Sequence, residues 1–509
     1  MRSKNVLTGS VATGLLSLVT ILYGLLIPKA VVLTYGSEIN GLTTSINQFI
    51  SYFSLLEAGL AGSAIFAMYK PLAVQDYGEI NGILAASKKY YDKISLIYAL
   101  GVCAFSLVFA CFFAPDGMGF LSTVLICLAV GSTGVLEFAT MSKYRVLLTA
   151  AQKTDVVSFA AILGVLLRIV LSYALVWIRA SIVLVMLLPG CMVLVRSAIL
   201  SVYVKKNFPL VRYDVRPNNS QLKQRGDVLL MQVLGSVHQA FPTVAMTLFG
   251  ISFAEISVYT VYTSITAGIK SLLNVFLNGS IYSTFGEVIA KKDYATLKRA
   301  AGEFEVGAYW LISVIFACLS ILYMPFINIY TAQMADANYT CPELAFMLTL
   351  NAYLYVIKNP LASMIQAAGH YQKTRWRTVT QAVIAVVVGT ALAKPLGVTG
   401  IMIGMICSNL YRTVDIVIYV PKNIILTTSW ASLRRMFSSV VSVVLAFSSF
   451  HLLFDVAALN YLQWLIWAVV AGVWSVMIST GITLLVSKKE FRSLLVRVKA
   501  LAGKLIRRK

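Results

Sequence analysis

The 509-residue sequence has few charged residues: Asp, Glu, Lys and Arg make up 12% of it, about half of the roughly 25% in soluble proteins. This scarcity excludes an ordinary soluble enzyme and a disordered polar chain. The seven cysteines include no C-x-x-C pair, so neither a disulfide framework nor a zinc site is expected. Three dispersed histidines make a metal cluster improbable. No G-x-x-x-x-G-K-[ST] loop is present, so ATP is excluded as an energy source bound here, and no cofactor is expected.

Hydrophobic residues, in contrast, form 59% of the chain, and its mean hydropathy is +0.81. Apolar runs of about 20 residues are typical of helices that cross a bilayer, since backbone groups in lipid must be bonded within the helix. The first run is too long for a signal peptide, so we expect a retained span. The sequence therefore predicts an all-α polytopic membrane protein with about fourteen transmembrane helices, at residues 6–33, 41–68, 94–114, 118–140, 156–178, 181–204, 227–250, 254–285, 304–328, 342–368, 378–394, 398–420, 436–455 and 461–486.

The charges that remain are unevenly distributed. The chain holds 42 Lys and Arg against 20 Asp and Glu, a net charge of +22 that in a soluble protein would indicate nucleic acid. The fourteen spans place 34 of the 42 basic residues on the side that holds both termini, and only Lys29, Arg179 and Lys394 on the other. This bias follows the positive-inside rule, so both termini are predicted to be cytoplasmic and no nucleic-acid partner is expected. The outward loops are short, so no outer domain is expected to house an active site, and we expect no enzyme.

The C-terminal segment at residues 487–509 alternates basic residues with Leu and Val at roughly helical spacing. It is predicted to be a basic amphipathic cytoplasmic tail that lies on anionic membrane lipids. A solvated positive tail is the alternative.

An internal repeat at an offset of about 216 residues divides the rest of the chain. It predicts an N-terminal six-helix lobe at 1–210, a C-terminal lobe at 211–426, and helices 13 and 14 at 427–486. Six spans per lobe give both lobes the same orientation around a central cavity, which is a transporter architecture that works by rocking. The matched landmarks are Pro28 and Pro242, Gly36 and Gly250, Glu38-Ile39 and Glu255-Ile256, Asp76-Tyr77 and Asp293-Tyr294, Gln152-Lys153-Thr154 and Gln372-Lys373-Thr374, and Arg196 and Arg412.

Several stretches resemble one known family: GLTTSINQFISYFSLLEAGLAGSAIFAMYKPLAVQDYGEINGIL (41–84), ISVYTVYTSI (256–265), FGEVIAKKDY (285–294), AAGHYQKTRWRTVTQAV (367–383) and GVTGIMIGMICSNLYRTVDIVIYVPKNIIL (397–426). From about residue 5 to 430 the chain resembles the Wzx-type bacterial polysaccharide flippases of the multidrug/oligosaccharidyl-lipid/polysaccharide exporter superfamily. The resemblance implies that undecaprenyl-diphosphate-linked oligosaccharides move from the inner to the outer leaflet of the cytoplasmic membrane, for surface polysaccharide biosynthesis. It also implies polysaccharide polymerase and chain-length machinery as partners.

Five basic residues fall inside the predicted spans: Arg168, Arg196, Lys270, Lys358 and Arg412. An embedded charge costs about 2.5–3.5 kcal/mol on insertion scales, so it should face a partner or a wet cavity. A lipid diphosphate needs such a cationic cavity, and Lys270, Lys358, Arg196 and Arg412 are the predicted substrate-binding residues.

Each of these assignments has a structural alternative. Arg412 precedes Asp415 by three residues and can pair with it on one helix face. Arg168 lies nearer the outer end of its span and can extend to the membrane surface, so it is not assigned to the substrate.

Embedded acids and prolines are candidates for coupling and movement. Glu57, Asp415 and His238 are predicted ion-coupling residues, because a buried carboxylate or imidazole can exchange protons during a conformational change. For Glu57 the alternative is a salt bridge, with Lys270 as one partner. Pro28 and Pro242 are predicted hinges, since proline removes a helical hydrogen bond, and the alternative is a fixed kink that shapes the cavity.

Other functions fit the sequence less well. A drug/cation antiporter of the same superfamily would have twelve spans and a more acidic cation site. A membrane glycan polymerase or ligase would need a long outward loop bearing catalytic Arg or His. A structural scaffold would not need the duplication.

Overall fold

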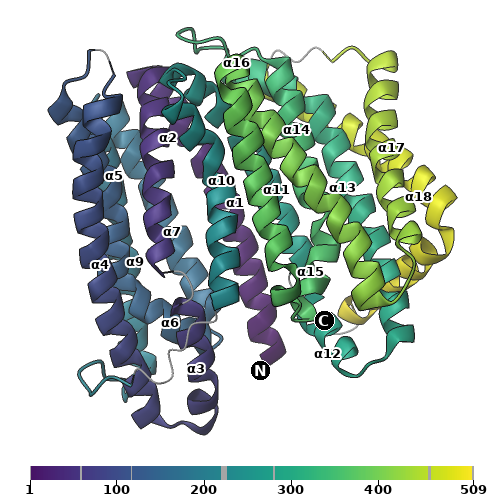
Figure 1. The fold of residues 1–509 in the computed structure, drawn as a ribbon, viewed down its shortest axis with the longest axis horizontal. Coiled ribbons are helices and arrows are strands. Elements are labelled where there is room, and N and C mark those ends of the chain that lie inside the picture. The colour runs from purple at the N-terminus through teal and green to yellow at the C-terminus, as the bar shows by residue number, and fades with distance from the viewer. Residues whose placement is uncertain are drawn as a thin grey trace. The chain divides into compact units, whose positions relative to one another are not determined.

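The computed structural model describes residues 2–57, 60–115, 117–218, 226–278, 281–456 and 460–506. All regular structure in these ranges is helical (Figure 1), which confirms the predicted all-α class. The chain divides into two compact units, which we call unit 1 (residues 1–268) and unit 2 (residues 269–509). The division into units does not test the lobe boundary near residue 210, which stays a prediction from the sequence repeat.

Unit 1 contains ten α-helices and the first part of an eleventh among its described residues. Two short irregular helical segments interrupt them, η1 (Tyr52–Glu57, 3-10) and η2 (Glu137–Met141, π). The α-helices are α1 (Arg2–Tyr35), α2 (Ser37–Ser51), α3 (Leu60–Val74), α4 (Tyr77–Phe113), α5 (Phe120–Leu136), α6 (Ser142–Ala150), α7 (Thr154–Trp177), α8 (Ile182–Gly190), α9 (Met192–Asn207), α10 (Gly226–Leu248) and α11 (Phe253–Asn278), which continues into unit 2.

The long helices α1 and α7 run in the same direction and are joined by side-chain hydrogen bonds. Thr13 contacts Ser158 at 3.4 Å, and the Tyr35 hydroxyl donates to the Ala180 carbonyl at 2.6 Å. Both pairs are separated by 145 residues, so the two helices keep one register over more than 20 residues. This register determines which side chains of α1 and α7 meet in the middle of unit 1.

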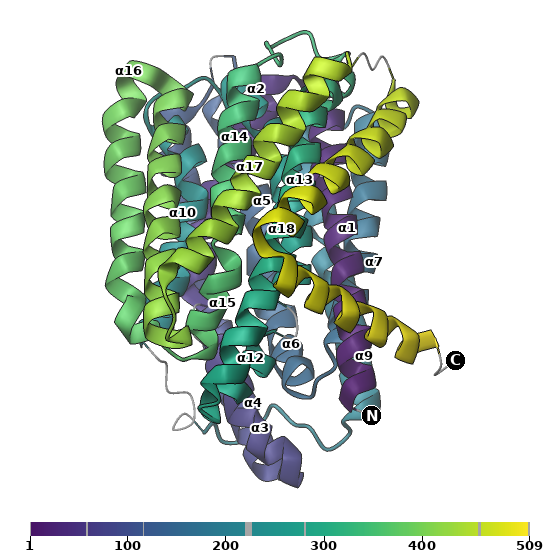
Figure 2. The same cartoon turned by 90° about the vertical axis from the view of Figure 1, so that its right-hand side faces the viewer.

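Unit 2 holds the C-terminal helices. They are α12 (Ile281–Ala290), α13 (Tyr294–Thr331), α14 (Pro342–Ile357), α15 (Asn359–Ala367), α16 (Tyr371–Val420), the π segment η3 (Pro421–Ile425), α17 (Ser429–Leu453) and α18 (Tyr461–Ile506). Helices α13, α17 and α18 pack on one another (Figure 2).

Two breaks divide the longest helices of unit 2. Gly397 in α16 has a φ of 56°, which glycine adopts at little cost, so the chain reverses there and forms two antiparallel segments. These segments touch at Gly389 and Gly404, where an added side chain would meet backbone atoms. Ser487 breaks α18 at φ −139°, ψ 46°, at the start of the predicted tail. Beyond it Phe491 is buried, so this part of the tail packs on the protein.

Ten helical stretches of the described chain are long and apolar enough to cross a membrane. When α16 is counted as two segments and α10, α11 and α14–α15 are added, helices occupy all fourteen predicted spans. Large apolar side chains face outward along these helices, among them Trp177, Phe112 and Leu452. Such a surface suits lipid rather than water. The chain is a multi-pass membrane protein.

The two units repeat several local structures. Asp76 caps α4 by accepting a hydrogen bond from the amide of Glu79, and Asp293 caps α13 in the same way from Thr296. The residue before each aspartate has a positive φ. Helices α6 and α15 each contain nine residues, and each is followed after three residues by a long helix, α7 or α16.

Candidate functional site

Two of the predicted substrate-binding lysines meet in unit 2. Lys358 lies at the break between α14 and α15, and Lys270 lies on α11. Their ammonium nitrogens are 5.1 Å and 5.4 Å from the centre of the Tyr355 ring. A ring face attracts cations but does not neutralise them. Among the described residues neither lysine has a carboxylate within salt-bridge distance, so no carboxylate of the protein competes with an anion for the pair.

Neutral amides hold Lys358 in place. Lys358 as a whole is 7% exposed, and its ammonium group donates to the Asn409 side-chain oxygen at 2.7 Å. Asn409, which is fully buried, also accepts from Gln381 at 3.2 Å and donates to Asn351 at 2.8 Å. The Asn409 amide oxygen accepts from one of the three N–H donors of the ammonium group and leaves its charge uncompensated. This arrangement can therefore bind an anionic group.

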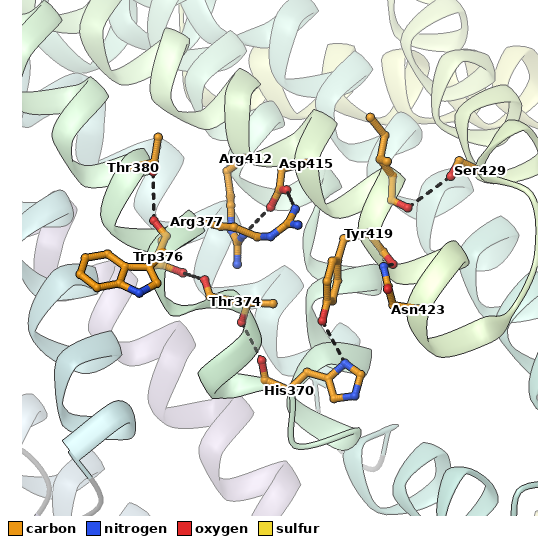
Figure 3. Close-up of polar contacts among 12 residues, drawn as sticks. His370, Thr374, Trp376, Arg377, Thr380, Arg412, Asp415, Tyr419, Asn423 and Ser429 are labelled. Carbon is orange, nitrogen blue, oxygen red and sulfur yellow. Dashed lines mark hydrogen bonds and ion pairs between the residues drawn. The ribbon is translucent and has the colours of Figure 1, made fainter.

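The predicted substrate-binding residue Arg412 lies in an ion-pair network (Figure 3), and its role in substrate binding stays a prediction. It donates to Asp415 at 2.5 Å, as the spacing of three residues allows, and Arg377 binds the other oxygen of the same carboxylate. Arg377 also lies 4.7 Å from the centre of the Tyr419 ring. Two arginines share one carboxylate, so the network retains a net positive charge. Asp415, a predicted ion-coupling residue, is thus fully engaged.

The Tyr419 hydroxyl continues this network to His370, which lies 3.1 Å away at Nδ1 (Figure 3). His370 precedes the first residue of α16. Burial, and next the nearby Lys373 charge, lower the pKa of His370 below its ordinary value. Protonation of this imidazole at the start of α16 is therefore disfavoured.

In unit 1 the predicted coupling residue Glu57 is part of a salt bridge. The same oxygen of Glu57 accepts two hydrogen bonds, one from Arg145 at 2.5 Å and one from the Tyr91 hydroxyl at 2.8 Å. Arg145 also binds Glu137 at 3.2 Å. The structural alternative for Glu57 is therefore what the structure contains, with Arg145 as the partner in place of Lys270. Proton coupling through Glu57 stays a prediction.

Arg196, the fourth predicted substrate-binding residue, crosses α7 at a glycine. A Cβ on Gly164 would lie 2.5 Å from the Cγ and Cδ atoms of Arg196, so only glycine leaves room for this side chain. The Nε atom of Arg196 is buried without a hydrogen-bond partner in the described structure. Its role in substrate binding stays a prediction.

Unit 1 encloses a cavity of about 420 Å³ between α1, α2, α5, α7, α8 and α11. The predicted hinge Pro28 lies in its wall, and α1 continues as a helix through that residue. The basic residue in the wall is Arg168, which the sequence favours less for substrate binding than the other four embedded basic residues.

Pro242 and His238 lie on α10, where His238 is 8% exposed. Their roles as hinge and coupling residue stay predictions.

Sequence reasoning missed several residues of these networks. By position Arg145, Arg377 and Arg435 count as cytoplasmic residues next to the spans. Arg145 and Arg377 bind the embedded acids, and Arg435 binds the buried Glu305 at 3.2 Å and Glu490 at 2.8 Å. A usable signal is present for Arg145, because it follows Glu137 by eight residues, about two helical turns, and so returns to the same face.

The described residues contain no group of three or more His, Cys, Asp or Glu side chains arranged to hold a metal ion.

Comparison of the sequence with protein-family models and with curated proteins finds no match. Solved structures do match. One is an inward-facing multidrug resistance MATE family transporter of the MOP superfamily, with a TM-score of 0.64 and 14% identity over 82% of this chain and 98% of that one. An outward-facing MATE transporter gives a TM-score of 0.54 at 15% identity, over 83% and 96% of the two chains.

The lipid II flippase MurJ, in an inward closed conformation, gives a TM-score of 0.69 at 12% identity and covers 94% of this chain and 98% of its own. The similar structures are thus transporters and a flippase rather than enzymes. We conclude that this chain shares the fold of these MOP superfamily transporters.

Proposed function

We propose that the protein flips undecaprenyl-diphosphate-linked oligosaccharide units from the inner to the outer leaflet of the bacterial cytoplasmic membrane by alternating access, for surface polysaccharide biosynthesis. In this proposal both termini are cytoplasmic, anionic lipids contact the basic tail, and polysaccharide polymerase and chain-length machinery act on the product. Pro28 and Pro242 are the proposed bending points.

The observation that carries the proposal is the lysine pair around Tyr355. Both lysines lie against the Tyr355 ring and Lys358 also donates to the Asn409 amide, so no carboxylate of the described protein binds either of them. A diphosphate carries negative charges that two ammonium groups can contact as point charges, without the geometric demands of a forked donor. An unneutralised pair within membrane-spanning helices suits an anionic head group that must bind and then leave.

The alternative, export of cationic drugs, requires free embedded carboxylates. In the described structure the best candidates, Glu57 and Asp415, are each bound to at least one arginine. A cation would have to displace those arginines. The charge pattern therefore favours an anionic substrate over a cationic one.

The test uses the purified protein in proteoliposomes that contain a fluorescent undecaprenyl-diphosphate-linked oligosaccharide. Transfer between leaflets is measured by the fraction of the label that a membrane-impermeant quencher reaches. Lys358→Ala and Lys270→Ala should each reduce the transfer rate at least tenfold, because each removes one of the two charges that meet the diphosphate.

Lys422→Ala is the matched control, because Lys422 is an exposed lysine of unit 2 outside the pair. It should transfer substrate at the unmodified rate. Unchanged transfer in both Lys270→Ala and Lys358→Ala would contradict the cationic site. Efflux of a cationic dye, with no transfer of the lipid-linked oligosaccharide, would favour the antiporter instead.

A further inference from the structure

The cavity in unit 1 has the size and lining of a small-molecule site. Its volume of about 420 Å³ falls within the roughly 300–1,000 Å³ typical of ligand pockets. Amide and hydroxyl groups from five helices, α1, α2, α5, α7 and α11, share its wall with apolar side chains. The polar lining residues are Tyr23, Asn40, Thr43, Thr44, Asn47, Thr133, Arg168, Ser172, Thr260 and Ser264.

Arg168 is the charged group of this wall, and most of its hydrogen-bonding capacity is unused. One terminal nitrogen donates to the Tyr23 hydroxyl at 3.3 Å, and the guanidinium lies 5.0 Å from the centre of the Tyr23 ring. Its Nε is buried with no hydrogen-bond partner. A guanidinium has five N–H donors in a planar fork. Among the described residues no carboxylate pairs with Arg168, and the Tyr23 side chain holds its guanidinium in position.

The register between α1 and α7 explains how Arg168 is positioned. Tyr23 and Arg168 are separated by 145 residues, as are the pairs that join the two helices near both ends. The guanidinium therefore stacks on a ring that a rigid helix pair holds in place. An arginine fixed in this way loses little side-chain entropy when it binds a ligand, which favours specific recognition.

The chemistry of the lining narrows the class of ligand. No acidic residue is among the described residues that line the cavity, so a cation has no partner there. Asparagine, serine and threonine side chains provide donors and acceptors suited to sugar hydroxyl groups. The single guanidinium fork matches a planar carboxylate, with which it can form two parallel hydrogen bonds.

We propose that this cavity of unit 1 is a subsite for one carboxylate-bearing sugar residue of the transported oligosaccharide, with Arg168 binding the carboxylate and the amide and hydroxyl groups binding the ring. The inference rests on the proposed function for its substrate, but the site itself can be tested by direct binding. It assigns the sugar to unit 1 and leaves the diphosphate to the lysine pair of unit 2.

The experiment measures binding of two matched sugars to the full-length protein in nanodiscs, by ligand-observed NMR. Methyl β-D-glucuronide and methyl β-D-glucoside differ only in the carboxylate at C6. The glucuronide should bind at least fivefold more tightly. Arg168→Gln should remove this preference, and Arg168→Lys should retain only part of it, since lysine keeps the charge but lacks the planar fork.

Two further variants distinguish loss of the binding site from a general effect on the protein. Gly24 lines the cavity, and a Cβ built there has no atom within 4 Å, so Gly24→Leu should occupy part of the cavity and weaken binding of both sugars. Arg179→Gln changes an exposed arginine just beyond α7 and should leave binding unchanged.

Equal binding of the two sugars, or an undiminished preference in Arg168→Gln, would overturn the proposal. Glucose 6-phosphate is the third ligand, and binding as tight as that of the glucuronide would overturn the assignment to a carboxylate. The wild-type protein is also assayed for lipid-linked oligosaccharide transfer. Specific glucuronide binding without any transfer would refute the proposed function while the subsite stands, and transfer without glucuronide preference would refute the subsite alone.

Discussion

The two units contain similar backbone segments whose basic residues differ in whether a carboxylate is bound to them. Helix α6 in unit 1 and helix α15 in unit 2 each have nine residues, begin 217 positions apart and follow an irregular turn. In unit 1 the charge near this turn is Arg145, bound to two carboxylates. In unit 2 it is Lys358, bound to an amide. Similar local structure thus accommodates an arginine paired with carboxylates in one unit and a lysine without a carboxylate partner in the other.

The comparison separates a structural charge from a functional one. A charge in a low-dielectric interior is stabilised only when it is paired, and pairing makes it unavailable to a ligand. Arg145 is paired with carboxylates and so stabilises its unit. Lys358 has no carboxylate partner, and an unpaired buried cation is costly to retain unless a substrate binds it. This reasoning predicts that substitution of Arg145 changes mainly stability and that substitution of Lys358 changes mainly transport.

The largest expected effect is the loss of Arg145. Arg145→Gln leaves the partly buried carboxylates of Glu57 and Glu137 unpaired, and breaking such an arrangement costs about 3 kcal/mol. The thermal unfolding midpoint, followed by intrinsic fluorescence in detergent, should fall by several degrees. The double variant Glu57→Gln/Arg145→Gln should recover roughly half of the loss, because one of the two unpaired charges is removed as well.

Arg179→Gln provides the control, since Arg179 is exposed and should leave the midpoint within a degree of the wild type. A midpoint for Arg145→Gln equal to that of the control would show that the unit 1 cluster is not structural. The contrast between the units would then fail.

The second prediction adds an ion pair in unit 2 where the first removes one from unit 1. Asn409→Asp places a carboxylate at the 2.7 Å contact with Lys358 and converts the available cation into an ion pair like that of unit 1. Transfer of the lipid-linked oligosaccharide should fall about tenfold, equivalent to about 1.4 kcal/mol, while the unfolding midpoint is maintained or rises. Asn409→Gln retains an uncharged amide and is the comparison variant. Equal transfer rates in the aspartate and glutamine variants would show that neutralising Lys358 is not what slows transfer.

The sequence predicts the helical fold class well because its signals are local. Apolar length indicates a span in each segment separately, and the repeat follows from landmarks such as the aspartates that cap α4 and α13. The pair of Arg412 and Asp415 is likewise predictable, because both residues lie within one helical turn.

The rest of the candidate site depends on packing between helices. Lys270 and Lys358 are 88 positions apart and meet only because α11 and α14 bring both to Tyr355. Arg377 reaches Asp415 across the reversal at Gly397, and nothing local distinguishes it from a loop arginine. Arg168 illustrates the same limit, since its distance along span 5 says nothing about which face of α7 lines a cavity.

A smaller effect distinguishes the two arginines that bind Asp415. The Arg412 side chain is 7% exposed and that of Arg377 is 41% exposed, so solvent replaces the contact of Arg377 more readily. Arg412→Gln should cost about 1–2 kcal/mol and Arg377→Gln about half of that, measured by thermal unfolding in detergent. Equal losses would mean that the two contacts with Asp415 contribute alike despite their difference in burial.

The smallest expected effect is a pH dependence at His370. Because the folded protein lowers the pKa of His370 below about 6.5, protonation opposes folding, and the associated stability is present above that pH and lost as the pH falls below it. The contribution should be only roughly a few tenths of a kcal/mol, since solvent screens this half-exposed imidazole. The unfolding midpoint of the wild type should therefore drop slightly more between pH 7.5 and about 5.5 than that of His370→Gln. Glutamine can still form a hydrogen bond with the Tyr419 hydroxyl but does not titrate, so identical pH profiles for the two proteins would assign the acid sensitivity to other groups.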